Sequence, residues 1–191
     1  MRIRIAQMKN ALLSYEWKNW IYNGRISWLQ SIWFLSILLL LAWLDGTTKF
    51  IWLVPPFSAT LTILLLLPKS PIAQPIPVVV GTTLAASVGI AVSLFVHGPI
   101  YAALVALIMV IILPLFRIYH PPGVALSMYP LLLHTGILFP IVVVLPFTLI
   151  SVVSCGILSK LSRTWSDYPL SLRKSIPSST HKCISVRPPA D

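Results

Sequence analysis

Long apolar runs, separated by short polar or proline-containing stretches, dominate the sequence between residues 27 and 160. The runs at residues 28–44 and 100–115 approach the roughly 20 apolar residues that a helix needs to cross a bilayer. Charged side chains are almost absent from these runs. This pattern predicts an all-α integral membrane protein.

The interruptions divide the apolar region into six segments. Four of them are long and cover about residues 27–44, 76–96, 99–117 and 137–160. Two short helices lie between them and begin at proline pairs, Pro55-Pro56 and Pro121-Pro122, because proline is tolerated in the first turn of a helix and presets φ. The first short helix has about 12 residues, or ~18 Å, against a hydrocarbon core of about 30 Å. We therefore expect half-helices at both positions.

The order long, short, long occurs twice, in halves at about residues 28–96 and 99–160. A repeat of three crossings places its second copy upside down, as in many secondary transporters. In the alternative topology the short helices are re-entrant, and only four helices span the membrane. The positive-inside rule favours six crossings, because only Lys49 would then lie outside, whereas four crossings would add Lys69 and Arg117. Both topologies put the two termini on one side, which we expect to be the cytoplasm.

One face of segment 76–96 carries a small residue at every fourth position. These residues are Gly81, Ala85, Gly89 and Ser93. Such a stripe lets another helix approach closely. We interpret it as a packing surface and not as a ligand site.

Composition supports the membrane assignment. Of the 191 residues, 57% are hydrophobic and 9% are charged, compared with about 25% charged residues in soluble domains. The net charge of +10 is concentrated near the two ends of the chain. Nucleic-acid binding is one reading of this charge, but basic flanks on the cytoplasmic side explain it better. We expect membrane lipids, including anionic headgroups, as partners, and no nucleic acid.

Three regions follow from this distribution: a basic interfacial arm at residues 1–25, a transmembrane domain at 26–160 and a polar, poorly ordered tail at 161–191. The long basic stretch ahead of the first apolar run has no small-residue cleavage site after it, which predicts a retained helix and not a signal peptide. A plasma membrane (the inner membrane in a bacterium) is the expected location. Cys155 and Cys183 lie far apart, so we predict no disulfide, no metal site and no cofactor.

Three motifs resemble those of a known family. They read "PPFSATL" at 55–61, "PKSPIAQP" at 68–75 and "HPPGVAL" at 120–126. In this order they are similar to the HPP family of integral membrane proteins, and the resemblance covers about residues 28–160. It implies four spanning helices, in contrast to the six crossings favoured above. Because some members are associated with nitrite transport, it also implies nitrite as the cargo.

The acidic residues all lie outside the predicted hydrocarbon regions: Glu16, Asp45, Asp167 and Asp191. Their positions argue against a cation pathway and are compatible with an anion or a neutral solute. The first turns of the two short helices offer unpaired N–H groups and the positive end of the helix dipole, which together suit an anion. The candidate pathway residues near these turns are Ser58, Thr60, Thr62, Gln74, Arg117, Tyr119, His120, Gly123 and Ser127.

Each candidate has a functional and a structural interpretation. His120 would donate to the anion or carry a proton with it, and Gly123 would let the backbone come close. Structurally, the proline pairs are simply helix starts, hydroxyls in membrane helices bond their own backbone, and Arg117 snorkels to the headgroups. His97 and His134 lie at helix ends, where we expect them at the membrane interface.

The sequence therefore predicts a transporter or channel for a small inorganic anion, with nitrite favoured by the resemblance. The alternatives are a non-transporting membrane scaffold or sensor subunit, and a transporter of a small neutral solute. No nucleophile with a base, metal-ligand cluster or phosphate-binding loop is evident, so we expect no enzymatic activity. A homo-oligomer is compatible with so thin a bundle.

Overall fold

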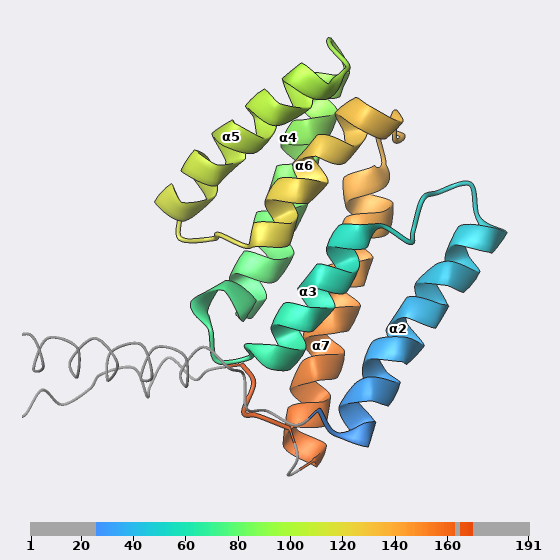
Figure 1. Ribbon diagram of the computed structural model, residues 1–191, viewed down its shortest axis with the longest axis vertical. Helices are drawn as coiled ribbons and strands as arrows, with labels where there is room; N and C mark the ends of the chain where they lie inside the picture. Colours follow the sequence, from blue (N-terminus) through green and yellow to red (C-terminus); the bar gives the residue numbers. More distant parts are fainter. Residues whose placement is uncertain (1–25, 163–164, 170–191) are drawn as a thin grey trace, which may run out of the picture.

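The computed structural model describes residues 26–162 and 165–169, and this part of the chain contains six α-helices and no strand. The helices lie roughly alongside one another in a single bundle (Figure 1). Their bounds are α2 Trp28–Thr47, α3 Pro55–Leu66, α4 Thr82–Ser93, α5 Pro99–Leu115, α6 Pro121–Leu133 and α7 Leu145–Leu161. The predicted arm at residues 1–25 and most of the predicted tail fall outside the described residues.

Within the part of the chain that the structure describes, two helices are long and apolar enough to cross a membrane by length and composition. One is α2, with 20 residues, and the other is the continuous helix Pro140–Leu161, with 22 residues. The other apolar helices have 10–17 residues. Helix α2 begins with a capping box, in which Ser27 Oγ accepts from the Gln30 backbone N–H and Gln30 Oε1 accepts from the Ser27 N–H.

Both short helices begin at their proline pairs, as predicted. Helix α3 has 12 residues and α6 has 13, which corresponds to roughly 18–20 Å of helix. The proline pair occupies the first turn in both. Each helix is therefore about two thirds as long as the hydrocarbon core is thick.

The third helix of each half begins with a π-helical segment that the sequence did not predict. These segments are η2 Pro77–Gly81, which runs into α4, and η3 Pro140–Val144, which runs into α7. Proline at the first position lacks the N–H that an α-helix would use, and single π turns are frequent at functional sites. A short 3₁₀ turn, η1 Pro71–Ala73, precedes the first of them.

Figure 1 shows that corresponding helices of the two halves run in opposite directions. Helix α2 runs upward and α5 downward, α3 downward and α6 upward, and α4 upward and α7 downward. The start of α2 and the end of α7 lie at the same, lower end of the bundle.

The small-residue stripe of α4 packs against α6, which confirms the predicted packing role. A methyl group added at Gly89 would overlap the carbonyl of Ser127 on α6. One added at Gly123 of α6 would lie 3.0 Å from the Cα of Thr82. The two backbones are therefore in direct contact along this seam.

Aromatic side chains connect the other helices. Phe57 of α3 stacks on Phe147 of α7 with ring centroids 3.8 Å apart. Trp33 of α2 donates its indole N–H to Ser154 Oγ of α7 over 2.9 Å. Trp165 and Tyr168 are buried against the bundle, so packed side chains continue past the end of α7 as far as Tyr168.

Candidate functional site at the start of the short helices

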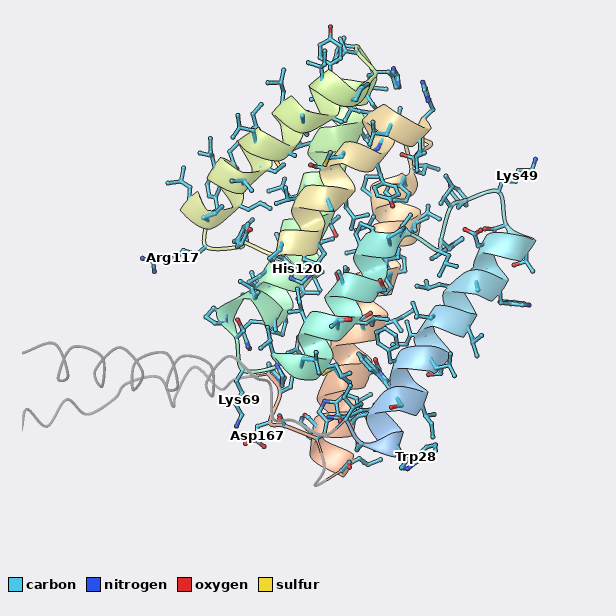
Figure 2. The ribbon with its side chains drawn as sticks, in the orientation of Figure 1. Trp28, Lys49, Lys69, Arg117, His120 and Asp167 are labelled. Carbon is cyan, nitrogen blue, oxygen red and sulfur yellow. The ribbon has the colours of Figure 1, made fainter. Side chains whose placement is uncertain are left out.

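His120 lies in the middle of the bundle and joins three segments (Figure 2). It is the N-cap residue of α6 and has no exposed surface. Its Nε2 lies 3.0 Å from Thr60 Oγ1 in the second turn of α3, and its Nδ1 lies 2.8 Å from the carbonyl oxygen of Ile72 in η1. The ring therefore holds the start of one short helix against the side of the other.

The partners of the ring decide its tautomer. A carbonyl oxygen only accepts, so Nδ1 carries a proton and donates it to Ile72. In the neutral ring Nε2 then carries a lone pair and accepts a hydrogen bond from the Thr60 hydroxyl. In the protonated ring Nε2–H donates to Thr60 Oγ1, whose own proton goes to the Pro56 carbonyl 3.2 Å away. Every member of the network has a partner in both states.

The helix starts do not offer the free N–H groups that the sequence suggested. Proline at the first two positions of each short helix has no N–H. The next N–H is already used, since Phe57 donates to the Val54 carbonyl and Gly123 to the His120 carbonyl, each over 2.9 Å. The positive end of the helix dipole remains at both helix starts. The hydrogen-bond donors available to an anion there, however, are side chains and not backbone N–H groups.

Thr82 is a buried polar residue that sequence reasoning missed. It follows the π segment η2 and has no exposed surface. Its Oγ1 has no hydrogen-bond partner among the described residues, and it faces the α6 start at Gly123. A threonine within a helix ordinarily donates to its own backbone. Nothing in the local sequence "GTT" at 81–83 therefore indicated that this hydroxyl would be unpaired.

Gly123 and Ser127 both lie in the closed seam between α4 and α6. Ser127 has no exposed surface, and its hydroxyl donates to the Val124 carbonyl over 2.7 Å. Gly123 is buried as well and packs on Thr82. The structure thus brings Thr60, His120 and Gly123 together at one junction.

Two predicted hydroxyls lie on the opposite face of α3. Thr62 is exposed and Ser58 is half-buried. Each bonds its own helix, Ser58 to the Pro55 carbonyl and Thr62 to the Ser58 carbonyl, both over 2.8 Å. The predicted set Ser58, Thr60 and Thr62 is therefore divided between two faces.

The remaining predicted residues have structural surroundings. Arg117 is exposed and points away from His120 (Figure 2). It ends α5 in a Schellman motif with φ 57°, because Arg117 N–H donates to Pro114 and Ile118 N–H to Leu113. Gln74 braces the linker by donating to the Pro68 and Ser70 carbonyls. Tyr119 packs on the core beneath α5.

The junction is polar, and no acidic side chain of the described residues lies beside it. Asp45 and Asp167 are the acidic residues of the described chain. Asp45 Oδ1 accepts from the Trp52 and Leu53 N–H groups at the far end of α2, and Asp167 is exposed at the lower periphery (Figure 2). Among the described residues no group of three histidine, cysteine or acidic side chains is placed to hold a metal.

His97 and His134 meet at the upper end of the bundle. His97 follows α4, and His134 is the C-cap of α6 in the left-handed conformation with φ 53°. Their rings stack with centroids 4.2 Å apart and planes 11° apart, beside a cavity of about 370 Å³. Sequence analysis placed both at helix ends, but their separation of 37 positions gave no sign of the contact.

Comparison with known proteins identifies the membrane domain. The family model described as "HPP, transmembrane region" matches residues 21–169, which includes all six helices and the packed segment after α7. Searches of curated proteins and of solved structures found no match to the chain.

Proposed function

The chain belongs to the HPP family and is an integral membrane protein, and from this premise we propose that it transports a small inorganic anion. The observation that carries the proposal is the Thr60–His120 contact, a buried polar junction between two half-length helices. Buried ionisable residues within membrane domains are rare and usually functional. We assign the protein no catalytic reaction.

We further propose that the two halves are an inverted repeat. Each contains a helix, a short helix begun by a proline pair and a helix with a π-helical start, in that order. Figure 1 supports inversion, because each helix runs opposite to its counterpart. Broken or short helices that start near the bilayer midplane form the substrate sites of many transporters with this symmetry.

We propose that transport is coupled to protonation of His120. In the neutral ring Nε2 presents a lone pair, which repels an anion. Protonation turns Nε2 into a donor, and a single anion then accepts from Nε2–H and from the Thr60 hydroxyl. Binding of the anion and of the proton therefore favour each other, and affinity rises as pH falls.

The described conformation is a closed state in this scheme. Thr60, His120 and Ser127 have no exposed surface. Opening separates α3 from α6, and the anion takes the place of the Thr60–His120 hydrogen bond. The unpaired hydroxyl of Thr82 lies at the α6 start and supplies a further donor to the opened site.

Nitrite is the cargo we favour, on the family resemblance of the motifs at 55–61, 68–75 and 120–126. The absence of acidic side chains at the junction supports an anion over a cation. We place the protein in a plasma membrane, with both termini in the cytoplasm, on the positive-inside rule.

Nitrite uptake into proteoliposomes tests the proposal, with protein-free liposomes to subtract passive entry of nitrous acid. We expect uptake to increase as the external pH falls, and chloride or nitrate to compete if the site accepts them. Thr60→Val removes one hydroxyl at constant volume and should reduce uptake roughly 10- to 100-fold, the value of a hydrogen bond to a charged group.

Thr148→Val is the matched control. Thr148 is equally buried on α7, but its hydroxyl donates to the Val144 and Leu145 carbonyls of its own helix. We expect near-normal uptake from this variant. If both variants transport equally well, or the folded wild type takes up none of the three anions, the junction is not a transport site.

One observation favours a second function, a non-transporting scaffold or sensor subunit. Both ring nitrogens of His120 and the N–H groups that follow the proline pairs already have protein partners. A purely structural junction would have this property. The absence of uptake from folded wild type would select this alternative.

A further inference from the structure

The outer side of α7 carries a hollow at its C-terminal end. A cavity of about 270 Å³ lies between α7, Pro75 of the linker and the segment at residues 168–169. A second hollow of about 330 Å³ adjoins it on α7, and both are lined by Val153 and Ile157. We call these two adjoining hollows the α7 groove.

The second wall of the groove is held rigidly. Trp165 packs edge-on against Trp33 of α2, with ring centroids 5.3 Å apart. The Tyr168 hydroxyl donates to the Ala73 carbonyl over 2.9 Å, and the Tyr168 carbonyl accepts from Ser159 Oγ over 2.7 Å. Burial raises the pKa of the Tyr168 phenol, so this donor persists across the neutral range. Residues 165–169 therefore stay beside the lower part of α7 (Figure 1).

The length of the groove corresponds to one leaflet of a bilayer. It is lined from Leu149 to Lys160, which is about 16 Å at 1.5 Å per residue. Half of a hydrocarbon core of about 30 Å is about 15 Å. The exposed apolar side chains Val153 and Ile157 lie midway. The floor is Gly156, where an added methyl group would meet no atom within 4 Å.

Charge distinguishes the two ends of the groove. Among the described residues that line either hollow, Lys160 in the last turn of α7 is the single charged one. No acidic side chain is among the described residues of the lining. A groove of leaflet length, apolar along its course and cationic at the membrane surface, complements an acyl chain joined to an anionic headgroup.

We propose that this groove binds an anionic phospholipid, with one acyl chain along α7 over Gly156 and the phosphate beside Lys160. The bound lipid would contact Pro75 and residues 168–169 as well as α7 and so fasten the linker and the returning segment to the bundle. This site is independent of the proposed anion pathway.

Native mass spectrometry of the purified protein, titrated with phosphatidylglycerol and with phosphatidylcholine of the same acyl chains, tests the proposal. We expect phosphatidylglycerol to bind about fivefold more tightly, the preference that one lysine near a membrane surface provides. Lys160→Gln should remove this preference while leaving the unfolding midpoint unchanged, because Lys160 is exposed.

Gly156→Leu fills the groove and should weaken retention of both lipids at least about tenfold. Gly46→Leu is its control, since Gly46 also lies in a helix with open space around it. Equal binding of the two lipids by the wild type would overturn the proposal. So would a phosphatidylglycerol preference that survives Lys160→Gln, or a folded Gly156→Leu protein that binds like Gly46→Leu.

Discussion

Helix α6 has a histidine at each end, and the two lie in opposite environments. His120 at the N-terminus has no exposed surface, and both ring nitrogens are bonded to other segments. His134 at the C-terminus is exposed, and its ring stacks on that of His97. The histidine at one end of the helix therefore belongs to a buried polar network, whereas the histidine at the other end stacks on an exposed ring.

The difference shows why residue type alone is a poor guide to a site. Buried polar groups are expensive to leave unpaired, so the network around His120 specifies one arrangement of α3, α6 and η1. An exposed histidine is solvated whether or not it stacks, so the His97–His134 contact specifies little.

Replacing each histidine by alanine compares the two ends directly. His120→Ala leaves the Ile72 carbonyl unpaired and opens a cavity, and we expect it to lower the free energy of unfolding by about 3 kcal/mol. His134→Ala should change it by no more than about 0.5 kcal/mol. Denaturant unfolding in mixed micelles measures both, and similar losses from the two variants would refute the contrast.

The glycines near the two ends offer a second comparison. Gly123→Ala would place a methyl group 3.0 Å from the Thr82 Cα, and overpacking of this kind should destabilise the protein by about 2 kcal/mol. Gly136→Ala, just beyond α6, meets no atom within 4 Å and should be nearly neutral. If Gly123→Ala leaves the free energy of unfolding unchanged in the same assay, α4 and α6 can move apart at this contact with little loss of stability.

Chemical modification compares the accessibility of the histidines. Diethyl pyrocarbonate should acylate His97 and His134 readily and His120 at least about tenfold more slowly, which corresponds to a local opening of about 1.4 kcal/mol. Peptide mapping by mass spectrometry after timed exposure gives the three rates. His120 reactivity equal to that of His134 would show that the junction is open in solution.

The left-handed backbone at His134 gives the smallest expected effect. Because a side chain is strained at φ 53°, His134→Gly should stabilise the protein by about 0.5–1 kcal/mol despite losing the ring stack. Arg117→Gly, at φ 57° in the Schellman motif of α5, should give a similar gain. A loss of stability from His134→Gly but not from Arg117→Gly would show that the His97 stack contributes more than the strain.

Local features were readable from the sequence. The apolar runs and the scarcity of charge determined the all-α membrane class, and the proline pairs marked the starts of α3 and α6 at Pro55 and Pro121. The stripe from Gly81 to Ser93 marked a helix contact. These signals are local because they depend on backbone φ, on helical periodicity and on transfer of side chains from water, and each acts within a few turns.

Contacts between distant segments were decided only by the tertiary structure. Thr60 and His120 are 60 positions apart, His120 and Ile72 are 48 apart, and Trp33 and Ser154 are 121 apart. Sequence reasoning selected Thr60 and His120 but included Ser58 and Thr62, which lie on the other face of α3, and it missed Thr82. Which face of a uniformly apolar helix turns inward depends on the neighbours that pack against it, and no local pattern in a chain with so few polar residues records those neighbours.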